Sequence, residues 1–206
     1  MATDKGVWNI QQVRDKQLQS LWEYSGPDDP GSLWAWGDNT FGELYLAGVT
    51  GGEPAKRSSP VQIPGTTWKD FMNVSGKATY SSMASKNDGT LWGWGRNQYG
   101  SIGNNTITYT SSPVQIPGTN WTGTYDTMSS GYSTSRAIKT DGTMWSWGRN
   151  ETGWLGLNEG ANPGPSKSSP CQIPGTTWTS NYAVTLQGAL AIKTDGTLWS
   201  WGYNNQ

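Results

Sequence analysis

The chain has 206 residues, a formal net charge of −1, one cysteine and no histidine. This charge gives no basic surface for nucleic acid or an anionic membrane, and a single cysteine excludes a disulfide framework within the chain. Without histidine there is no Ser-His or Cys-His nucleophile pair and no histidine-bound metal, so we expect a protein that is not an enzyme and uses no cofactor.

The first 26 residues predict a short amphipathic helix. Ile10, Val13, Leu18, Leu21 and Trp22 fall on one side of a helical wheel, opposite charged and amide side chains. A helix of about fourteen residues is marginal on its own. We therefore expect it either to cap an open edge of the following domain or to dock into a larger assembly. The chain has no apolar stretch of membrane-spanning length, and residues 1–20 lack the apolar core of a signal peptide.

After a linker at 27–32, residues 33–206 form a series of repeats. The pentapeptides LWAWG (33–37), LWGWG (91–95), MWSWG (144–148) and LWSWG (198–202) recur at spacings of 58, 53 and 54 residues. Repeats of this length are typical of propeller blades or solenoids. With 28 glycines and 11 prolines, the composition also favours an all-β, loop-rich fold.

Each repeat contains a predicted hairpin. An alternating apolar and polar run meets Asp-Gly and continues into the Trp-rich strand, which is a strong hairpin signal. The turns are Asp88-Gly89, Asp141-Gly142 and Asp195-Gly196. Alternation places Trp145 and Trp147 on one face of the strand. The small residue between the two tryptophans suggests that a neighbouring sheet lies close to the opposite face; it is Ala35, Gly93, Ser146 or Ser200.

A second recurring block predicts a short strand between prolines, followed by a Pro-Gly turn and a tryptophan. Its copies are SSPVQIPGTTW (58–68), SSPVQIPGTNW (111–121) and SSPCQIPGTTW (168–178). Proline is tolerated at strand ends and edges. Because large aromatic rings bury much surface, we expect the repeated tryptophans to form the core between units. Cys171 replaces valine of the sister repeats, which predicts a small buried apolar residue.

A third block, W-G-x-N-x-x-G, is expected to form a loop in which asparagine bonds to the backbone. The asparagines are Asn39, Asn97, Asn150 and Asn204. Along the chain, the W-G-x-N-x-x-G block comes first, the proline-flanked strand second and the Asp-Gly hairpin third. In this order the three blocks resemble the repeat of the regulator of chromosome condensation family over residues 31–206. This resemblance implies a β-propeller closed by seven blades. The sequence departs from the family pattern at Glu43-Leu44-Tyr45 and in the clipped last unit, WGYNNQ.

About three to four blades fit into this sequence, so we expect them to be part of a seven-blade ring. Three units alone would leave open sheet edges, which invite pairing or aggregation. The strand Thr197–Trp201 carries neither charge nor proline to protect it. We therefore expect the missing blades to come from a longer gene product or, as an alternative, from a neighbouring subunit.

The segment GVWNIQQVRDKQLQSLW at 6–22 resembles N-terminal segments of structural and tail-fibre proteins of tailed bacteriophages. This resemblance implies a virion protein, such as a tail fibre, head fibre or decoration protein. It would be present in multiple copies and anchored to other virion proteins through an apolar set consisting of Val7, Trp8, Ile10, Val13, Leu18, Leu21 and Trp22.

The propeller would then face outward and bind a host-surface protein or glycan. The loops at 45–57, 104–110 and 157–167 differ most between units, and we expect Tyr45, Tyr109 and Trp154 to be exposed near them as receptor or sugar contacts. Two alternatives stay open. One is a carbohydrate-binding propeller, and the other is the protein-interaction or guanine-nucleotide exchange role that the family resemblance implies.

Overall fold

The computed structural model describes residues 31–44, 56–71, 81–130, 133–159, 164–184 and 188–203. The elements in these ranges are β-strands, which confirms the predicted all-β fold. No helix that could span a membrane occurs within them. The predicted N-terminal helix lies outside the described residues, and so do Tyr45, Asn204 and the expected anchoring residues Val7, Trp8, Ile10, Val13, Leu18, Leu21 and Trp22.

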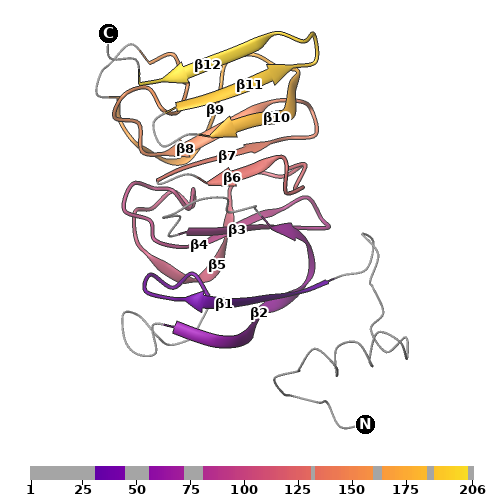
Figure 1. Cartoon of the computed structure of the whole chain (residues 1–206), viewed down its shortest axis with the longest axis vertical. Coiled ribbons are helices and arrows are strands. Elements are labelled where there is room, and N and C mark those ends of the chain that lie inside the picture. Colours follow the sequence, from indigo (N-terminus) through magenta and orange to yellow (C-terminus); the bar gives the residue numbers. More distant parts are fainter. Residues whose placement is uncertain are drawn as a thin grey trace.

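Within these ranges, twelve strands form three antiparallel sheets. The first sheet has five strands in sequence order: β1 (Gly31–Asp38), β2 (Lys56–Phe71), β3 (Ser81–Lys86), β4 (Leu91–Gly95) and β5 (Thr110–Ile116). The second has β6 (Met128–Ser130), β7 (Thr134–Ile138), β8 (Met144–Gly148) and β9 (Lys167–Gln172). The third has β10 (Trp178–Val184), β11 (Gly188–Lys193) and β12 (Leu198–Gly202). In Figure 1 the sheets stack along the long axis, from β1 and β2 at one end to β12 at the other.

The sequence repeat corresponds to a four-stranded unit, which is complete in β6 to β9. Strand β2 belongs to two units, because its first half pairs with β1 and its second half with β3. We therefore call β1 with the first half of β2 unit 1, and the rest of the first sheet unit 2. Strands β6 to β9 are unit 3, and β10 to β12 are unit 4. The number of units in a closed ring stays a prediction.

The predicted Asp-Gly hairpins are confirmed in units 2, 3 and 4. In unit 2, Gly89 has a φ of +77° and donates its N–H to the Lys86 carbonyl at 3.1 Å. Asp88 accepts hydrogen bonds from the Thr90 N–H at 2.9 Å and the Thr90 hydroxyl at 2.6 Å. The Thr90 hydroxyl in turn accepts the indole N–H of Trp92 at 2.8 Å. The same chain of bonds recurs at Asp141 and Asp195, so the turn also orients the first tryptophan of each pair.

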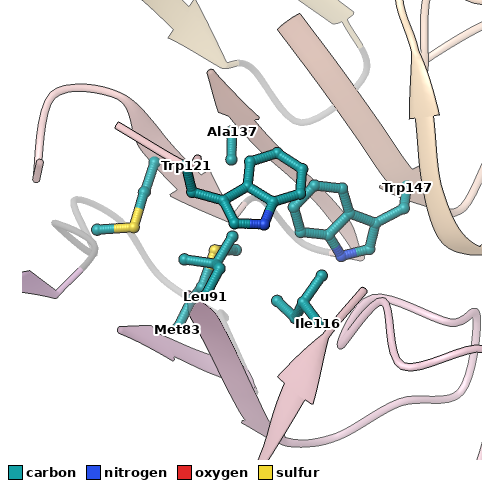
Figure 2. Packing of buried hydrophobic residues seen from close by; sticks show 7 residues of the cluster. Met83, Leu91, Ile116, Trp121, Ala137 and Trp147 are labelled. Carbon is teal, nitrogen blue, oxygen red and sulfur yellow. The ribbon is translucent and has the colours of Figure 1, made fainter. Parts of the chain in front are cut away.

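The core lies at the junctions between units. At the junction of units 2 and 3, the Trp121 ring contacts Trp147 and Trp145, with centroids 6.1 and 6.2 Å apart. This confirms that the paired tryptophans share one face. Leu91 and Ile116 of unit 2 complete the cluster with Met83, Met128 and Ala137, as Figure 2 shows for six of these residues. Equivalent clusters form around Trp68 and Trp178. Each buried indole removes about 150–250 Å² of surface from contact with water, and this burial stabilises the packing of neighbouring units.

Two packing expectations need correction. The first is that all repeat tryptophans are buried. Trp34, Trp36 and Trp199 are 50%, 64% and 48% exposed, because they belong to the first and last units, which have a described neighbour on one side only. Cys171 is likewise half-buried rather than buried, since β9 lies at the edge of its sheet.

The second correction concerns the small residue between the paired tryptophans. A Cβ atom on Gly93 would lie 3.1 Å from Ile102, and the Ser146 hydroxyl donates to the Leu155 carbonyl at 2.6 Å. Both partners belong to the loop that follows the strand in the same unit. This loop, rather than the neighbouring sheet, makes the close approach. It also reaches the next unit, since the Trp147 indole donates to the Ser101 carbonyl at 2.9 Å.

Candidate binding surface

The W-G-x-N-x-x-G loops lie at one rim of the strands, opposite the Asp-Gly hairpins. Their buried asparagines shape them as expected, because the side-chain oxygen of Asn97 accepts the Ile102 N–H at 2.9 Å. Asn39 and Asn150 make the same bond to Leu44 and Leu155, at 2.8 and 3.1 Å. These bonds confirm the structural role predicted for the three asparagines. They also fix the residues on either side of each asparagine on the rim.

The residue before the asparagine in unit 2, Arg96, stacks on an aromatic ring of unit 1. Its guanidinium carbon lies 5.1 Å from the centre of the Phe41 ring. The Arg96 Nε donates to the Tyr109 hydroxyl at 3.3 Å, and its Nη2 donates to Gln98. Tyr109 also contacts Phe41 edge to face, with ring centres 6.0 Å apart. A cation, an aromatic ring and a phenol are therefore held together at the rim.

The same arrangement recurs one unit further along. The guanidinium carbon of Arg149 lies 4.7 Å from the Tyr99 ring centre and 5.1 Å from that of Trp154, and Arg149 pairs with Glu151. In both copies, the aromatic residue of one unit's loop supports the arginine of the next. We call Phe41, Arg96, Tyr99 and Arg149 the rim stripe. It runs across three units, and each of its side chains is partly exposed.

The three expected contact residues have different outcomes. Tyr109 is 45% exposed beside the rim stripe, and Ile107 on the same loop is 66% exposed. Trp154 is only 6% exposed, so its expected exposure was wrong: its ring lies beneath the Arg149 guanidinium group. Tyr45 lies outside the described residues. Whether any of them contacts a receptor stays a prediction.

Sequence reasoning missed the rim stripe, although a signal for it exists. An arginine stands two residues after Trp94 and Trp147, and an aromatic residue stands five residues after Trp36 and Trp94. The spacing alone does not reveal that the aromatic residue of one unit meets the arginine of the next. That contact depends on how neighbouring units pack.

The opposite rim also repeats a cation between aromatic rings. The Lys139 Nζ lies 4.9 Å from the Trp121 ring centre and 4.4 Å from that of Trp145. Lys86 and Lys193 occupy the same position between tryptophans in units 2 and 4. Each lysine lies beside the hairpin Asp, and the threonine hydrogen bonds, helped by the lysine charge, lower the pKa of that carboxyl. Since every lysine covers core tryptophans, we interpret this rim as structural.

No group of three or more potential metal-binding side chains occurs in the described ranges. Burial raises the pKa of the Cys171 thiol, which leaves it a poor nucleophile at neutral pH. The feature that recurs at this rim in the described residues is a surface of aromatic and guanidinium groups.

Comparisons with known proteins identify the repeats. Residues 88–137 and 141–181 match the regulator of chromosome condensation (RCC1) repeat. Over 193 residues the chain is 24% identical to the RCC1 domain-containing protein RUG3, mitochondrial, of Arabidopsis thaliana, covering 88% of this chain and 40% of the relative.

Two solved structures show the fold. The structure of human WBSCR16 has a TM-score of 0.65 and 20% identity, over 85% of this chain and 43% of that one. Prp20p of Saccharomyces cerevisiae, described with its binding properties to Gsp1p and histones, has a TM-score of 0.64 and 17% identity, over 85% and 42%. This chain thus spans less than half of each of these proteins. It carries RCC1 repeats and is homologous to RCC1-like β-propeller proteins.

Proposed function

We propose that this protein is a non-catalytic binding protein that contacts a macromolecular partner through the rim stripe and Tyr109. The observation that carries the proposal is the repeated stacking of Arg96 on Phe41 and of Arg149 on Tyr99, beside a 45% exposed tyrosine. Arginine and tyrosine are enriched among the residues that dominate binding energy at protein interfaces. Because stacking already orients both guanidinium groups, binding costs less side-chain entropy.

The partner that this surface fits best is a protein. Prp20p, which shares the fold, is described with protein partners. Guanidinium groups next to aromatic rings can pair with carboxylates while the rings bury apolar side chains. The lectin alternative is weaker, because Trp154 is buried beneath Arg149 and leaves Tyr109 as its only exposed ring among the described candidates. The exchange-factor alternative rests on the family resemblance.

For the setting, we propose a tailed-bacteriophage virion, in which residues 1–26 attach the protein to the particle and the repeats face outward. The support is the resemblance of the segment at 6–22 to phage structural proteins. Deleting residues 1–26 should leave the repeats folded by circular dichroism while the protein disappears from purified particles. Unchanged incorporation would remove the virion anchor from the proposal.

A double substitution tests the binding role itself. Changing Arg96 and Tyr109 together to alanine should weaken binding of the purified protein to host cells by about tenfold or more, as expected for residues at an interface centre. Tyr125→Ala is the matched control, because Tyr125 is 60% exposed but follows Trp121 at the opposite rim. Equal binding by the double variant and the wild type would refute a role for the rim stripe.

A further inference from the structure

Arg136 is an arginine in a position that its sister units give to apolar residues. It precedes Ala137-Ile138-Lys139 in β7, as Met83 precedes Ala84-Ser85-Lys86 in β3 and Leu190 precedes Ala191-Ile192-Lys193 in β11. Met83 is 3% exposed and belongs to the apolar core between units 2 and 3. Arg136 is 1% exposed and reaches toward unit 4, where it lies 5.8 Å from the Trp201 ring centre.

The buried guanidinium has one hydrogen-bond acceptor where it could use several. Its Nη2 donates to the Trp154 carbonyl, whereas Nε and Nη1 have no partner in the described part of the chain. No carboxylate forms an ion pair with it there. Burial lowers the pKa of Arg136 to about 10, which still leaves it cationic at neutral pH. A buried charge without a counter-charge costs several kcal/mol, so proteins rarely leave one uncompensated.

Further unsatisfied donors surround Arg136. Ser129 is its cross-strand neighbour on β6, and Tyr182 reaches the same place from β10 of unit 4. Among the described residues, neither hydroxyl has a hydrogen bond of ordinary geometry, although Ser129 is close enough to lower the pKa of Tyr182. Burial outweighs that effect and raises the Tyr182 pKa to about 12, so its hydroxyl keeps its proton as a donor. The Trp201 ring lies 5.8 Å from the Arg136 guanidinium carbon, and its indole N–H also lacks an acceptor among the described residues.

The nearby acidic group does not fill this need. Asp126 is close enough to raise the pKa of Tyr182, but its side chain is exposed and accepts the Thr124 hydroxyl. The site therefore combines one positive charge with several donors and lacks a negatively charged acceptor. A water molecule would accept hydrogen bonds without compensating the charge. A phosphate dianion would bring more charge than one guanidinium balances.

We propose that Arg136, Ser129 and Tyr182 bind a chloride-sized monovalent anion at the junction of units 3 and 4. The anion accepts one of the two Arg136 N–H groups that lack a partner, at Nε or Nη1, together with the Ser129 hydroxyl of unit 3 and the Tyr182 hydroxyl of unit 4. Because its ligands come from both units, the bound anion joins them. The junction of units 2 and 3 is held by apolar packing of Met83 at the equivalent position and needs no ion.

Anion exchange at constant ionic strength tests the site. Replacing gluconate, which is too large to enter, by chloride at about 100 mM should raise the unfolding midpoint of the full chain by about 3 °C, because a ligand that binds the folded state stabilises it. Arg136→Met, which restores the residue type of Met83, should show no such shift. The absence of a shift in the wild type, or equal shifts in both proteins, would overturn the proposal.

A crystallographic measurement on the wild type makes the test independent of the variant's folding. Crystals of the full chain soaked in bromide should show an anomalous peak within hydrogen-bonding distance of Arg136 Nε or Nη1. Density for water alone at that position, with no anomalous signal, would rule the anion out.

Discussion

The junction between units 2 and 3 and the junction between units 3 and 4 use equivalent strand positions, yet one is apolar and the other polar. Met128 and Tyr182 are equivalent, because they pair with Ala137 and Ala191 at the same point of the repeat. The first junction places Met83, Met128 and Trp147 in a buried apolar cluster. The second brings together Arg136, Tyr182 and Trp201, whose side chains carry polar atoms without a hydrogen-bond partner in the described ranges.

The difference shows which parts of the repeat hold the fold and which can vary. The Asp-Gly turn, the lysine between tryptophans and the isoleucine of the proline-flanked strand recur at both junctions. These features depend on contacts within one unit or with the repeated tryptophans. The residue before the alanine of the hairpin block, Met83 in unit 2 and Arg136 in unit 3, faces the next unit. Its side chain decides whether that junction is apolar or polar.

The largest expected effect comes from removing the central indole of the apolar junction. Trp147→Ala should lower the free energy of unfolding by about 3–5 kcal/mol, the usual cost of truncating a buried large aromatic residue. Trp147 is fully buried and its indole N–H is hydrogen-bonded, whereas Trp201 is partly exposed and its indole N–H has no partner among the residues that the structure describes. Trp201→Ala should therefore cost less. Equal losses in urea unfolding would mean that the two junctions contribute alike.

A smaller effect, of opposite sign, is expected from making the polar junction resemble the apolar one. In buffer without small anions, Arg136→Met should raise the free energy of unfolding by about 1–4 kcal/mol, because an uncompensated buried charge is replaced by packing. Leu190→Met is the control, since Leu190 holds the same repeat position but is 43% exposed. Destabilisation by Arg136→Met in urea unfolding would contradict the assignment of an uncompensated charge.

The smallest effect tests a feature that the two junctions share. Hydrogen bonds from Thr143 lower the pKa of Asp141 below its ordinary value of 3.8. A carboxyl whose pKa is lowered by folding stabilises the protein above its unfolded pKa and loses that contribution as the pH falls through its folded pKa.

Asp141→Asn keeps an acceptor for Thr143 but removes the titration. It should slightly reduce the loss of stability between about pH 5 and pH 2, measured as a shift of the urea midpoint. Asp195→Asn should behave in the same way, because its turn has the same bonds. A clear difference between the two variants would show that the turns, and not only the junctions, differ between units.

Much of the molecule could be predicted from sequence because the relevant interactions are local and repeated. The Asp-Gly turns, the asparagine loops and the common face of Trp145 and Trp147 follow from short-range conformational preference and strand alternation. Four copies of one pattern also identified the repeat architecture, because a substitution at a single position does not hide a block that recurs.

The candidate surface was only partly predictable. Tyr109 is exposed at the rim as its variable loop suggests, but Trp154 is covered by Arg149. A tryptophan in a variable loop looks the same in sequence whether it faces solvent or the next unit. The stacking of Arg96 on Phe41 also joins residues 55 positions apart, and no local rule connects them.

By itself, the sequence determined the turns, the alternation of strand faces and the set of tryptophans available for the core, because these depend on neighbouring residues along the chain. The tertiary structure decided which tryptophans are buried and which loop fills the space beside Gly93 and Ser146. It also decided that Arg136 lies among unsatisfied donors from two units. Burial and charge compensation depend on what the next unit brings into contact, and only the packing of one unit on another fixes that contact.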